Sequence, residues 1–325
     1  MRFYLILFIS FSLLFLSKKY SNAQCFASPG NPIAGSTNLG VLNKNKFRSI
    51  VFHKYSYLSD YLKNNKKCNY KYVSSANYNF IGAILSYGIS DKFTAETEIG
   101  YFINKTQYYV NPNLPVHNGY GLSNALISLK YNIYKNLLKD IKFSLGAGSK
   151  LPFSTQPQML HNAPLPVDVQ PSTGNYGIVL QSFFVKEYPD IKFRFFIINY
   201  YEKNFNKNQQ GYIFGDAYIS SIFLSRHLYF YWTDLTKDIT AILQFRHEYR
   251  ERNTLRNTIT QEVKPVEYSG SNLFFISPQL NYNLKKFWNI SAIVDIPVYQ
   301  YFNGIQLSNK FSFAFSVSKD FGFKE

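Results

Sequence analysis

The chain has 325 residues, a formal net charge of +16 and a mean hydropathy of −0.20. Beyond residue 16 it contains no uninterrupted apolar run of the roughly 18 residues that a membrane-spanning helix needs. Aromatic residues make up 19% of the chain, and outer-membrane barrels use such residues as girdles at both membrane interfaces. A membrane protein without helical spans must be a closed barrel, because only these two forms satisfy every backbone hydrogen-bonding group in lipid.

The first 23 residues have the parts of a signal peptide. Arg2 precedes an apolar core from Phe3 to Leu16, and small residues occupy positions 21–23. We expect cleavage and export; an uncleaved membrane anchor is the alternative, for which the apolar core is short. An exported chain does not normally meet nucleic acid. The positive charge therefore indicates anionic solutes, or the lipids and lipopolysaccharide of an outer membrane, as partners.

Residues 24–45 form a leader that is rich in Gly, Pro, Ser and Asn and shows little periodicity. The chain has two cysteines, Cys25 in this leader and Cys68 in the first predicted loop. Because the periplasm oxidises thiols, we predict that the two form a disulfide. The leader would then run up through the barrel lumen as a plug, for which its extended length is sufficient. The alternatives are that both thiols are free or that the leader lies outside the barrel.

From residue 46 to residue 325 the sequence alternates between apolar and polar side chains. In residues 93–104, Phe93 and Tyr101 fall on one face and Glu96 falls on the other, because successive strand side chains point to opposite sides. We predict strands at residues 46–57, 72–89, 93–104, 122–134, 141–151, 176–187, 191–201, 216–232, 239–251, 272–284, 288–301 and 310–323.

The connections between these strands alternate in length, with a short one after every second strand. This parity matches the short periplasmic turns and long extracellular loops of outer-membrane barrels. A soluble all-β sandwich gives no reason for such alternation. The sequence therefore predicts an all-β fold, a single twelve-stranded antiparallel transmembrane β-barrel in a Gram-negative outer membrane.

Charged and polar side chains fall on the predicted inner face and are the candidate lumen-lining residues. They are Glu96, Glu98, Lys130, Lys142, Lys150, Lys192, Arg194, Gln244, Arg246, Glu248, Arg250 and Asp295. In one interpretation they form a net basic lumen that steers anionic or polar solutes. In the other they pair with one another and fill a narrow lumen.

Several short motifs resemble those of a family of outer-membrane barrels associated with phenol and toluene catabolism, the MetA-pathway family. The motifs are residues 121–124 leading into 129–131, residues 148–152 followed by 168–174, and residues 277–280 and 296–299. The resemblance implies a transporter-like barrel in the outer membrane and no particular substrate. The end of the chain, Phe321-Gly322-Phe323, is similar to the signal that barrel-assembly machinery reads, which makes this machinery a predicted partner.

These observations predict a channel for the passive passage of small polar or anionic solutes, with aromatic or hydrophobic solutes as a further class. We predict no enzymatic activity and no cofactor. A lipid-active enzyme is one alternative: His247 falls on the outward face, yet no histidine has a serine two residues after it and there is no Gly-x-Ser-x-Gly motif. A structural or metal-binding barrel is the other, with Met159, His161 and His117 as loop ligands.

Overall fold

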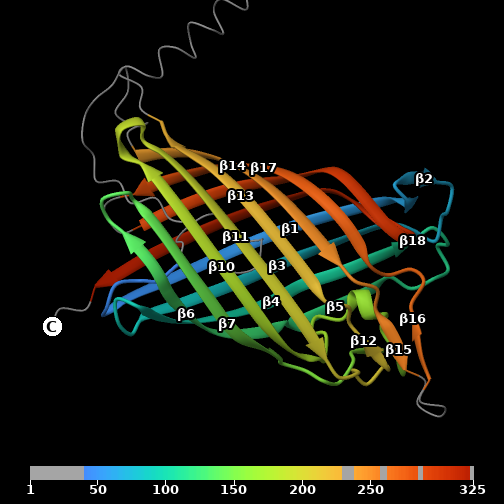
Figure 1. Ribbon diagram of the computed structural model, residues 1–325. Coiled ribbons are helices and arrows are strands. Elements are labelled where there is room, and N and C mark those ends of the chain that lie inside the picture. The colour runs from blue at the N-terminus through green and yellow to red at the C-terminus, as the bar shows by residue number, and fades with distance from the viewer. Residues whose placement is uncertain (1–39, 229–237, 257–261, 285–287, 323–325) are drawn as a thin grey trace, which may run out of the picture.

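The computed structural model describes residues 40–228, 238–256, 262–284 and 288–322, and this part of the chain is mostly β-strand (Figure 1). Eleven strand elements of the described residues form the wall of one antiparallel barrel. They are β1 (Lys46–Asn64), β3 (Val73–Gly88), β4 (Phe93–Tyr109), β6 (Asn124–Asn136), β7 (Ile141–Pro152), β10 (Tyr176–Tyr188), β11 (Phe193–Phe205), β13 (Ala217–His227), β14 (Ile239–Arg250), β17 (Ser271–Leu284) and β18 (Trp288–Gly322). No helix in the described residues is long and apolar enough to cross a membrane.

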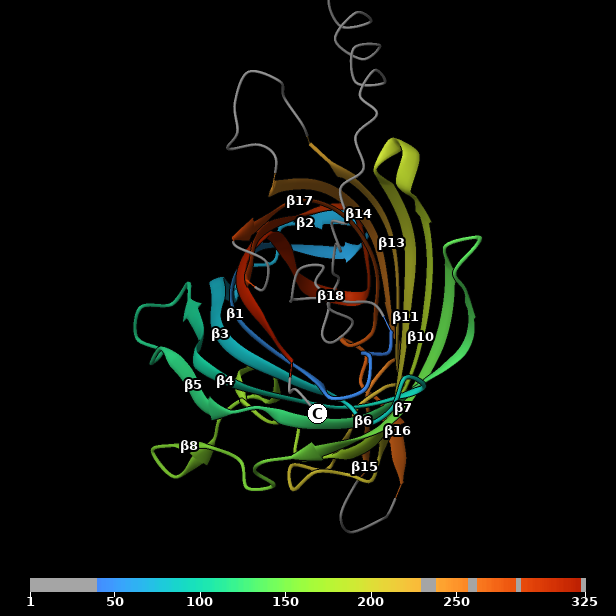
Figure 2. The ribbon, with the colours of Figure 1, turned by 90° about the vertical axis from the view of Figure 1, so that its left-hand side faces the viewer.

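Each wall strand pairs with its neighbours in chain order, and β18 pairs with β1 to close the ring. Figure 2 looks along the barrel and shows the strands arranged around a central axis. The predicted all-β fold, a single closed antiparallel barrel, is confirmed.

The last wall element, β18, crosses the wall twice. Residues 288–302 pair with β17 and residues 302–322 pair with β1. Both pairings are antiparallel, so the chain reverses within β18, where Gly304 has the positive φ of 73° that suits a tight turn. The loop predicted between residues 301 and 310 was wrong, because these residues continue the strand pairing with β1.

Three predicted strands extend at their C-terminal ends by four or more residues. β11 continues to Phe205 instead of residue 201. β1 continues to Asn64 instead of residue 57, and β4 continues to Tyr109 instead of residue 104. The predicted loop 105–120 also contains most of β5 (His117–Leu122). These extensions lie on the side of the long connections, where strand pairing continues beyond the predicted spans. The signal peptide, Cys25, the end of predicted strand 216–232 and the turn at 285–287 lie outside the described residues.

Buried side chains alternate with exposed ones along the wall strands. In β18, Phe313 and Phe315 are each 41% exposed, whereas Ala314 is 3% and Ser316 is 2% exposed. Because the barrel is closed, the buried row faces the interior and the exposed aromatic row faces outward. An outward apolar face is the arrangement that lipid requires.

Aromatic side chains fill part of the interior by packing over glycines of the next strand. The ring of Phe52 in β1 lies over Gly82 of β3, and the ring of Phe80 in β3 lies over Gly100 of β4. A Cβ atom added at Gly82 would be 2.2 Å from Cζ of Phe52. The ring centroids of Phe80 and Phe102 are 4.8 Å apart. The missing glycine side chains therefore provide the space that these rings occupy.

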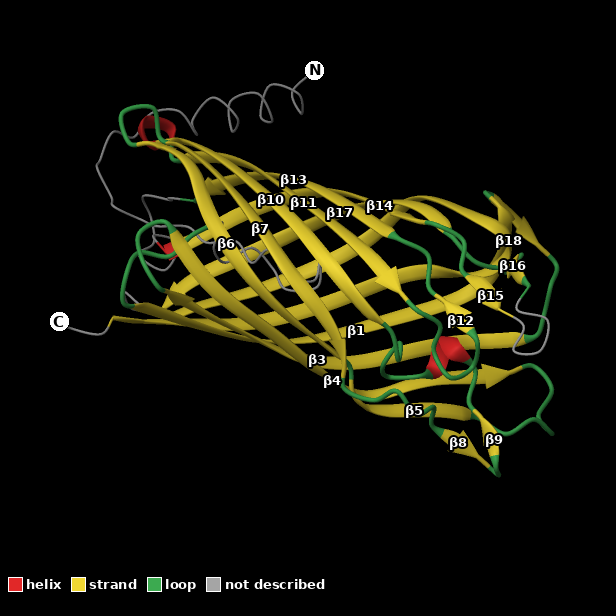
Figure 3. Cartoon of the chain, turned by 60° about the horizontal axis from the view of Figure 1, so that its bottom comes forward, coloured by secondary structure: helices red, strands yellow, loops and turns green. Residues whose placement is uncertain are grey.

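The long connections gather at one end of the barrel (Figure 3). They contain small strands and one 3₁₀ turn: β2 (Lys66–Cys68), β8 (Met159–Leu160), β9 (Ala163–Pro164), η2 (Val167–Val169), β12 (Tyr212–Ile213), β15 (Thr254–Arg256) and β16 (Val263–Pro265). A second 3₁₀ turn, η3 (Pro189–Ile191), lies in the short connection between β10 and β11.

The loop between β7 and β10 completes the wall beside β5. Among the described residues, β5 pairs with β4 alone. On its other side the amide of Gln158 bonds to Tyr120: its oxygen accepts from the backbone N–H at 3.1 Å and its nitrogen donates to the backbone oxygen. In the same loop Val169 is 1% exposed, and the Lys105 ammonium donates to the backbone oxygen of Gln170 at 2.9 Å. The loop therefore packs against β4 and β5 at this end of the barrel.

Candidate functional site

The centre of the barrel holds a buried network of charged side chains. Arg246 of β14 donates from its two terminal nitrogens to the carboxylate of Asp295 in β18, at 3.0 and 3.1 Å. The same carboxylate accepts from Lys54 of β1 at 3.1 Å and from the hydroxyl of Ser277 at 2.6 Å. Arg246 also lies 2.8 Å from the carboxylate of Glu248. One carboxylate thus joins four strands that are neighbours in the wall, β14, β17, β18 and β1.

Further ion pairs surround this network. The ammonium of Lys130 in β6 lies 2.6 Å from Glu96 of β4, and both side chains are buried. Glu96 also accepts from the hydroxyl of Ser86 at 2.8 Å. Near the short-turn end, Arg194 pairs with Glu187 at 2.6 Å. Many interior cations are therefore neutralised by a carboxylate on a neighbouring strand.

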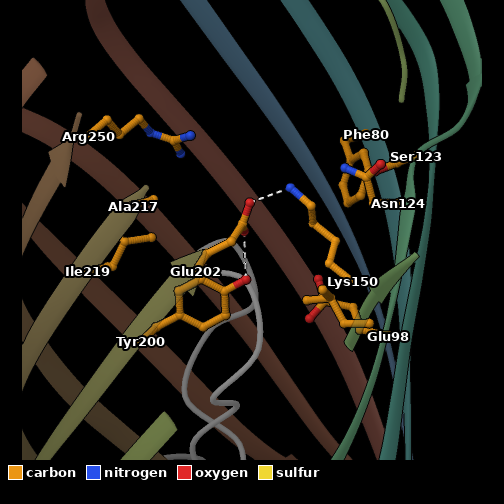
Figure 4. Close-up of a pocket in the computed structure, with 11 residues that line it drawn as sticks. Phe80, Glu98, Ser123, Asn124, Lys150, Tyr200, Glu202, Ala217, Ile219 and Arg250 are labelled. Carbon is orange, nitrogen blue, oxygen red and sulfur yellow. Dashed lines mark hydrogen bonds and ion pairs between the residues drawn. The ribbon is translucent and has the colours of Figure 1, made fainter. Parts of the chain in front are cut away.

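A cavity of about 100 Å³ lies inside the barrel beside Lys150 of β7, Glu202 of β11 and Arg250, the last residue of β14 (Figure 4). Its charged and hydroxyl side chains include the Lys150–Glu202 ion pair, at 2.5 Å, and Tyr200, whose hydroxyl donates to the second oxygen of Glu202 at 2.9 Å. Arg250 extends toward the cavity from the end of β14, and Glu98 lines it from β4. The remaining lining residues are Phe80, Ser123, Asn124, Leu126, Ala217 and Ile219. This is a water-accessible space with both charged and apolar walls.

The structure places most of the predicted lumen residues on the buried face of the wall. Those that are at most 6% exposed are Glu96, Glu98, Lys130, Lys150, Gln244, Arg246 and Asp295. Lys142, Arg194 and Glu248 are partly exposed, and Arg250 is exposed beside the cavity. Lys192 differs from the prediction: it follows η3 with a left-handed φ of 51° and so lies in the short turn before β11 instead of in a strand. Lys54, Tyr200 and Glu202 also belong to the interior networks and were not predicted.

The candidate residues for a lipid-active enzyme and for metal binding lie outside these ion-pair networks. Nε2 of His247 donates to the side-chain oxygen of Asn272 at 2.8 Å, and the ring stacks on Phe274 with ring centroids 4.4 Å apart. Ser220 lies opposite His247 on the neighbouring strand β13. Its hydroxyl donates to the side-chain oxygen of Asn199 at 2.7 Å. The Ser220 hydroxyl is thus hydrogen-bonded to an amide oxygen.

The predicted loop ligands, His117, Met159 and His161, lie in two different connections. His117 bonds to the hydroxyl of Tyr109 at 2.6 Å. Met159 lies in β8, and His161 follows it with a left-handed φ of 49°. Within the described part of the chain, no group of three His, Cys, Asp or Glu side chains is arranged to hold a metal ion. Cys68 is partly exposed at the end of β2, and its predicted partner lies outside the described residues.

No family model and no curated protein matches the chain. Solved outer-membrane barrels do resemble it in structure. The COG4313 outer-membrane channel of Pseudomonas putida F1 has a TM-score of 0.67 and 10% sequence identity, over 90% of this chain and 99% of that one.

Two weaker structural matches are the KdgM porin and the toluene transporter TbuX of Ralstonia pickettii. The KdgM porin has a TM-score of 0.42 and 11% identity, over 84% of this chain and 99% of that chain. TbuX has a TM-score of 0.42 and 10% identity, over 92% of this chain and 96% of that chain. The first likeness, to the COG4313 channel, shows that the chain has the fold of an outer-membrane channel barrel.

Proposed function

We propose that the chain forms a channel in the outer membrane of a Gram-negative cell, through which small polar or anionic solutes pass passively. The observation that carries this proposal is a closed wall with a charged interior and a cavity on the side of the long loops. Buried charges are costly, and in membrane barrels such groups line the solute path or pair across it. Here the interior contains both paired and solvent-accessible charges.

The outer surface of the wall supports placement in a membrane. Ile127 is 51% exposed and Phe313 is 41% exposed on the outward face. Single exposed apolar residues are ordinary on soluble proteins, but continuous outward rows on several strands are not. We propose outer-membrane lipid and lipopolysaccharide as the surrounding partners. The motif resemblance makes distant kinship with the MetA-pathway family part of this proposal.

We further propose that the leader, residues 24–45, acts as a plug of this channel. Its described end supports the idea. The backbone N–H of Leu42 donates to the hydroxyl of Thr94 at 2.8 Å, and Leu42 is 6% exposed. A Cβ atom at Gly40 would lie 2.8 Å from the hydroxyl of Ser144. Thr94 and Ser144 are buried residues of β4 and β7, so residues 40–42 lie inside the barrel near its short turns.

Electrical recording from the purified protein in planar lipid bilayers tests the channel. We expect discrete current steps in potassium chloride, with larger steps after residues 24–39 are deleted. The matched control is the same protein unfolded by boiling, which should give no steps. If neither the full chain nor the deletion variant conducts, the barrel is not a channel and a structural or lipid-directed role is favoured.

A further inference from the structure

We propose that the cavity on the side of the long loops binds a small monocarboxylate with an apolar body, and that Arg250 supplies the group that pairs with the carboxylate. The inference rests on the proposed function, because it names the class of solute that the same lumen would hold. Three observations support it. Arg250 forms no ion pair with another described residue, the neighbouring Lys150 and Glu202 pair with each other, and part of the cavity wall is apolar.

Arg250 faces the cavity close enough to the Glu202 carboxylate for the two charges to interact, but it forms no direct contact with that carboxylate. Among the described residues, no side chain forms an ion pair or hydrogen bond with its guanidinium, whereas Arg246, four residues earlier on the same face of β14, contacts both Asp295 and Glu248. Figure 4 shows the guanidinium extending from the wall toward the open space. The planar guanidinium presents N–H donors in a fork that matches the two oxygens of a carboxylate.

The other charges beside the cavity limit the ligand to a single negative charge. Both oxygens of Glu202 are engaged, one by Lys150 and one by the hydroxyl of Tyr200. Lys150 is in turn held by Glu202 and by the side-chain oxygen of Asn204. Glu98 is a further carboxylate in the lining, and β4 carries it on a different part of the wall from Arg250. Among the described residues that line the cavity, Arg250 is the one cation without an ion pair, so the second charge of a dianion would have no cation of its own.

A smaller, apolar part of the mostly polar cavity wall favours a ligand with a short hydrocarbon body. Phe80 is 3%, Ala217 is 4% and Ile219 is 6% exposed, and all three line the cavity together with Leu126. A volume of about 100 Å³ holds roughly seven water molecules. Releasing such water from apolar side chains favours binding of a compact apolar group. The cavity therefore suits a molecule of the size of butyrate, with its carboxylate at Arg250 and its methylenes against the apolar residues.

Saturation-transfer NMR of butyrate with the detergent-solubilised full chain tests the site. We expect butyrate to bind and butyramide, its neutral analogue, to bind at least about 10-fold more weakly, because only the carboxylate can form the charge-assisted pair. This comparison uses the unmodified protein and needs no variant to fold. Equal binding of the two molecules, or no binding of butyrate, would overturn the proposal.

Two variants assign the binding to Arg250. Arg250→Gln should weaken butyrate binding about 10-fold, whereas Arg256→Gln, which removes an exposed arginine of β15 outside the cavity, should leave it unchanged. Heat-modifiable gel migration would show that both variants are folded. Wild-type affinity in Arg250→Gln would refute the assignment. Chloride conductance is recorded separately. If the protein conducts but does not bind butyrate, the binding site is refuted and the channel is not. If it binds butyrate but does not conduct, the proposed channel is refuted.

Discussion

Asp295 of β18 accepts hydrogen bonds from both terminal nitrogens of Arg246 in β14, and the two side chains are each 2% exposed. Lys54 approaches the same carboxylate at 3.1 Å. The Asp295 carboxylate therefore faces two buried cations. Arg246 also forms an ion pair with Glu248. Removing one member of such a group leaves uncompensated charge in a poorly solvated interior.

We expect Asp295→Asn to lower the free energy of unfolding by about 3 kcal/mol or more, because Arg246 and Lys54 remain buried without their shared carboxylate. The matched control is Asp60→Asn. Asp60 pairs with Lys67 and Lys310 where the carboxylate is 39% exposed, and an exposed pair contributes less than about 1 kcal/mol. Urea unfolding in lipid vesicles, followed by tryptophan fluorescence, measures both. Equal effects of the two changes would show that the Asp295 network is not a stabilising element.

Gly82→Ala should destabilise the barrel by about 1–3 kcal/mol, because the added methyl group would lie 2.2 Å from the buried ring of Phe52. Gly322→Ala is the control, since a Cβ atom at that position has no neighbour within 4 Å. The same unfolding experiment applies. Combining Gly82→Ala with Phe52→Leu should recover part of the loss, because the smaller side chain leaves room for the methyl group. No recovery would mean that the contact with Phe52 is not the cause.

The channel should pass chloride more readily than potassium, and the preference should be modest because many interior cations are paired. Arg250→Glu should reduce or reverse it, whereas Arg256→Glu should not. Reversal potentials across a potassium chloride gradient measure this. The difference should shrink at high salt, because the Debye length falls from about 10 Å at 0.1 M to about 3 Å at 1 M. A cation preference in the unmodified protein would contradict the proposal that the lumen favours anions.

The predicted disulfide between Cys25 and Cys68 remains a prediction. Cys68 lies in β2 on the side of the long loops, whereas Leu42 lies inside the barrel near the short turns. The fifteen or so residues between Cys25 and Gly40 can extend over roughly 50 Å, enough to reach the other end. Mass spectrometry of a non-reduced digest should show the cross-linked peptides, and Cys68→Ser should abolish them. If both thiols are free, the disulfide no longer supports a plug. The buried contacts of residues 40–42 would then be the remaining support for it.

The fold was predictable because alternation and connection length are local properties of the sequence. In β14 every second position from Gln244 to Arg250 is polar, so the inner face is evident. In β1 the inner row contains Ile50 and Phe52 as well as Lys54, and polarity alone does not separate its two faces. This is why Lys54 was missed.

The partners of the buried charges could not be predicted from the sequence. Arg246 and Asp295 are 49 positions apart, and their contact depends on the register of every strand pairing between them. Glu202 lies one residue beyond the predicted end of its strand at residue 201, although β11 continues to Phe205. The lining of the cavity depends on the register of the strand pairings and on strands that extend past their predicted ends. Neither can be read from the sequence.

The seam between β1 and β18 sets the order in which the barrel can be assembled. Lys46 pairs with Gly322 and Tyr57 pairs with Phe311, so the closing contacts join segments from opposite ends of the described chain. Contacts between such distant segments form slowly, because the cost of closing a long loop precedes their gain. Until β18 arrives, β1 has one unpaired edge, which can template pairing with another chain. Synthesis and export must therefore keep the early strands from pairing elsewhere until the last strand is delivered.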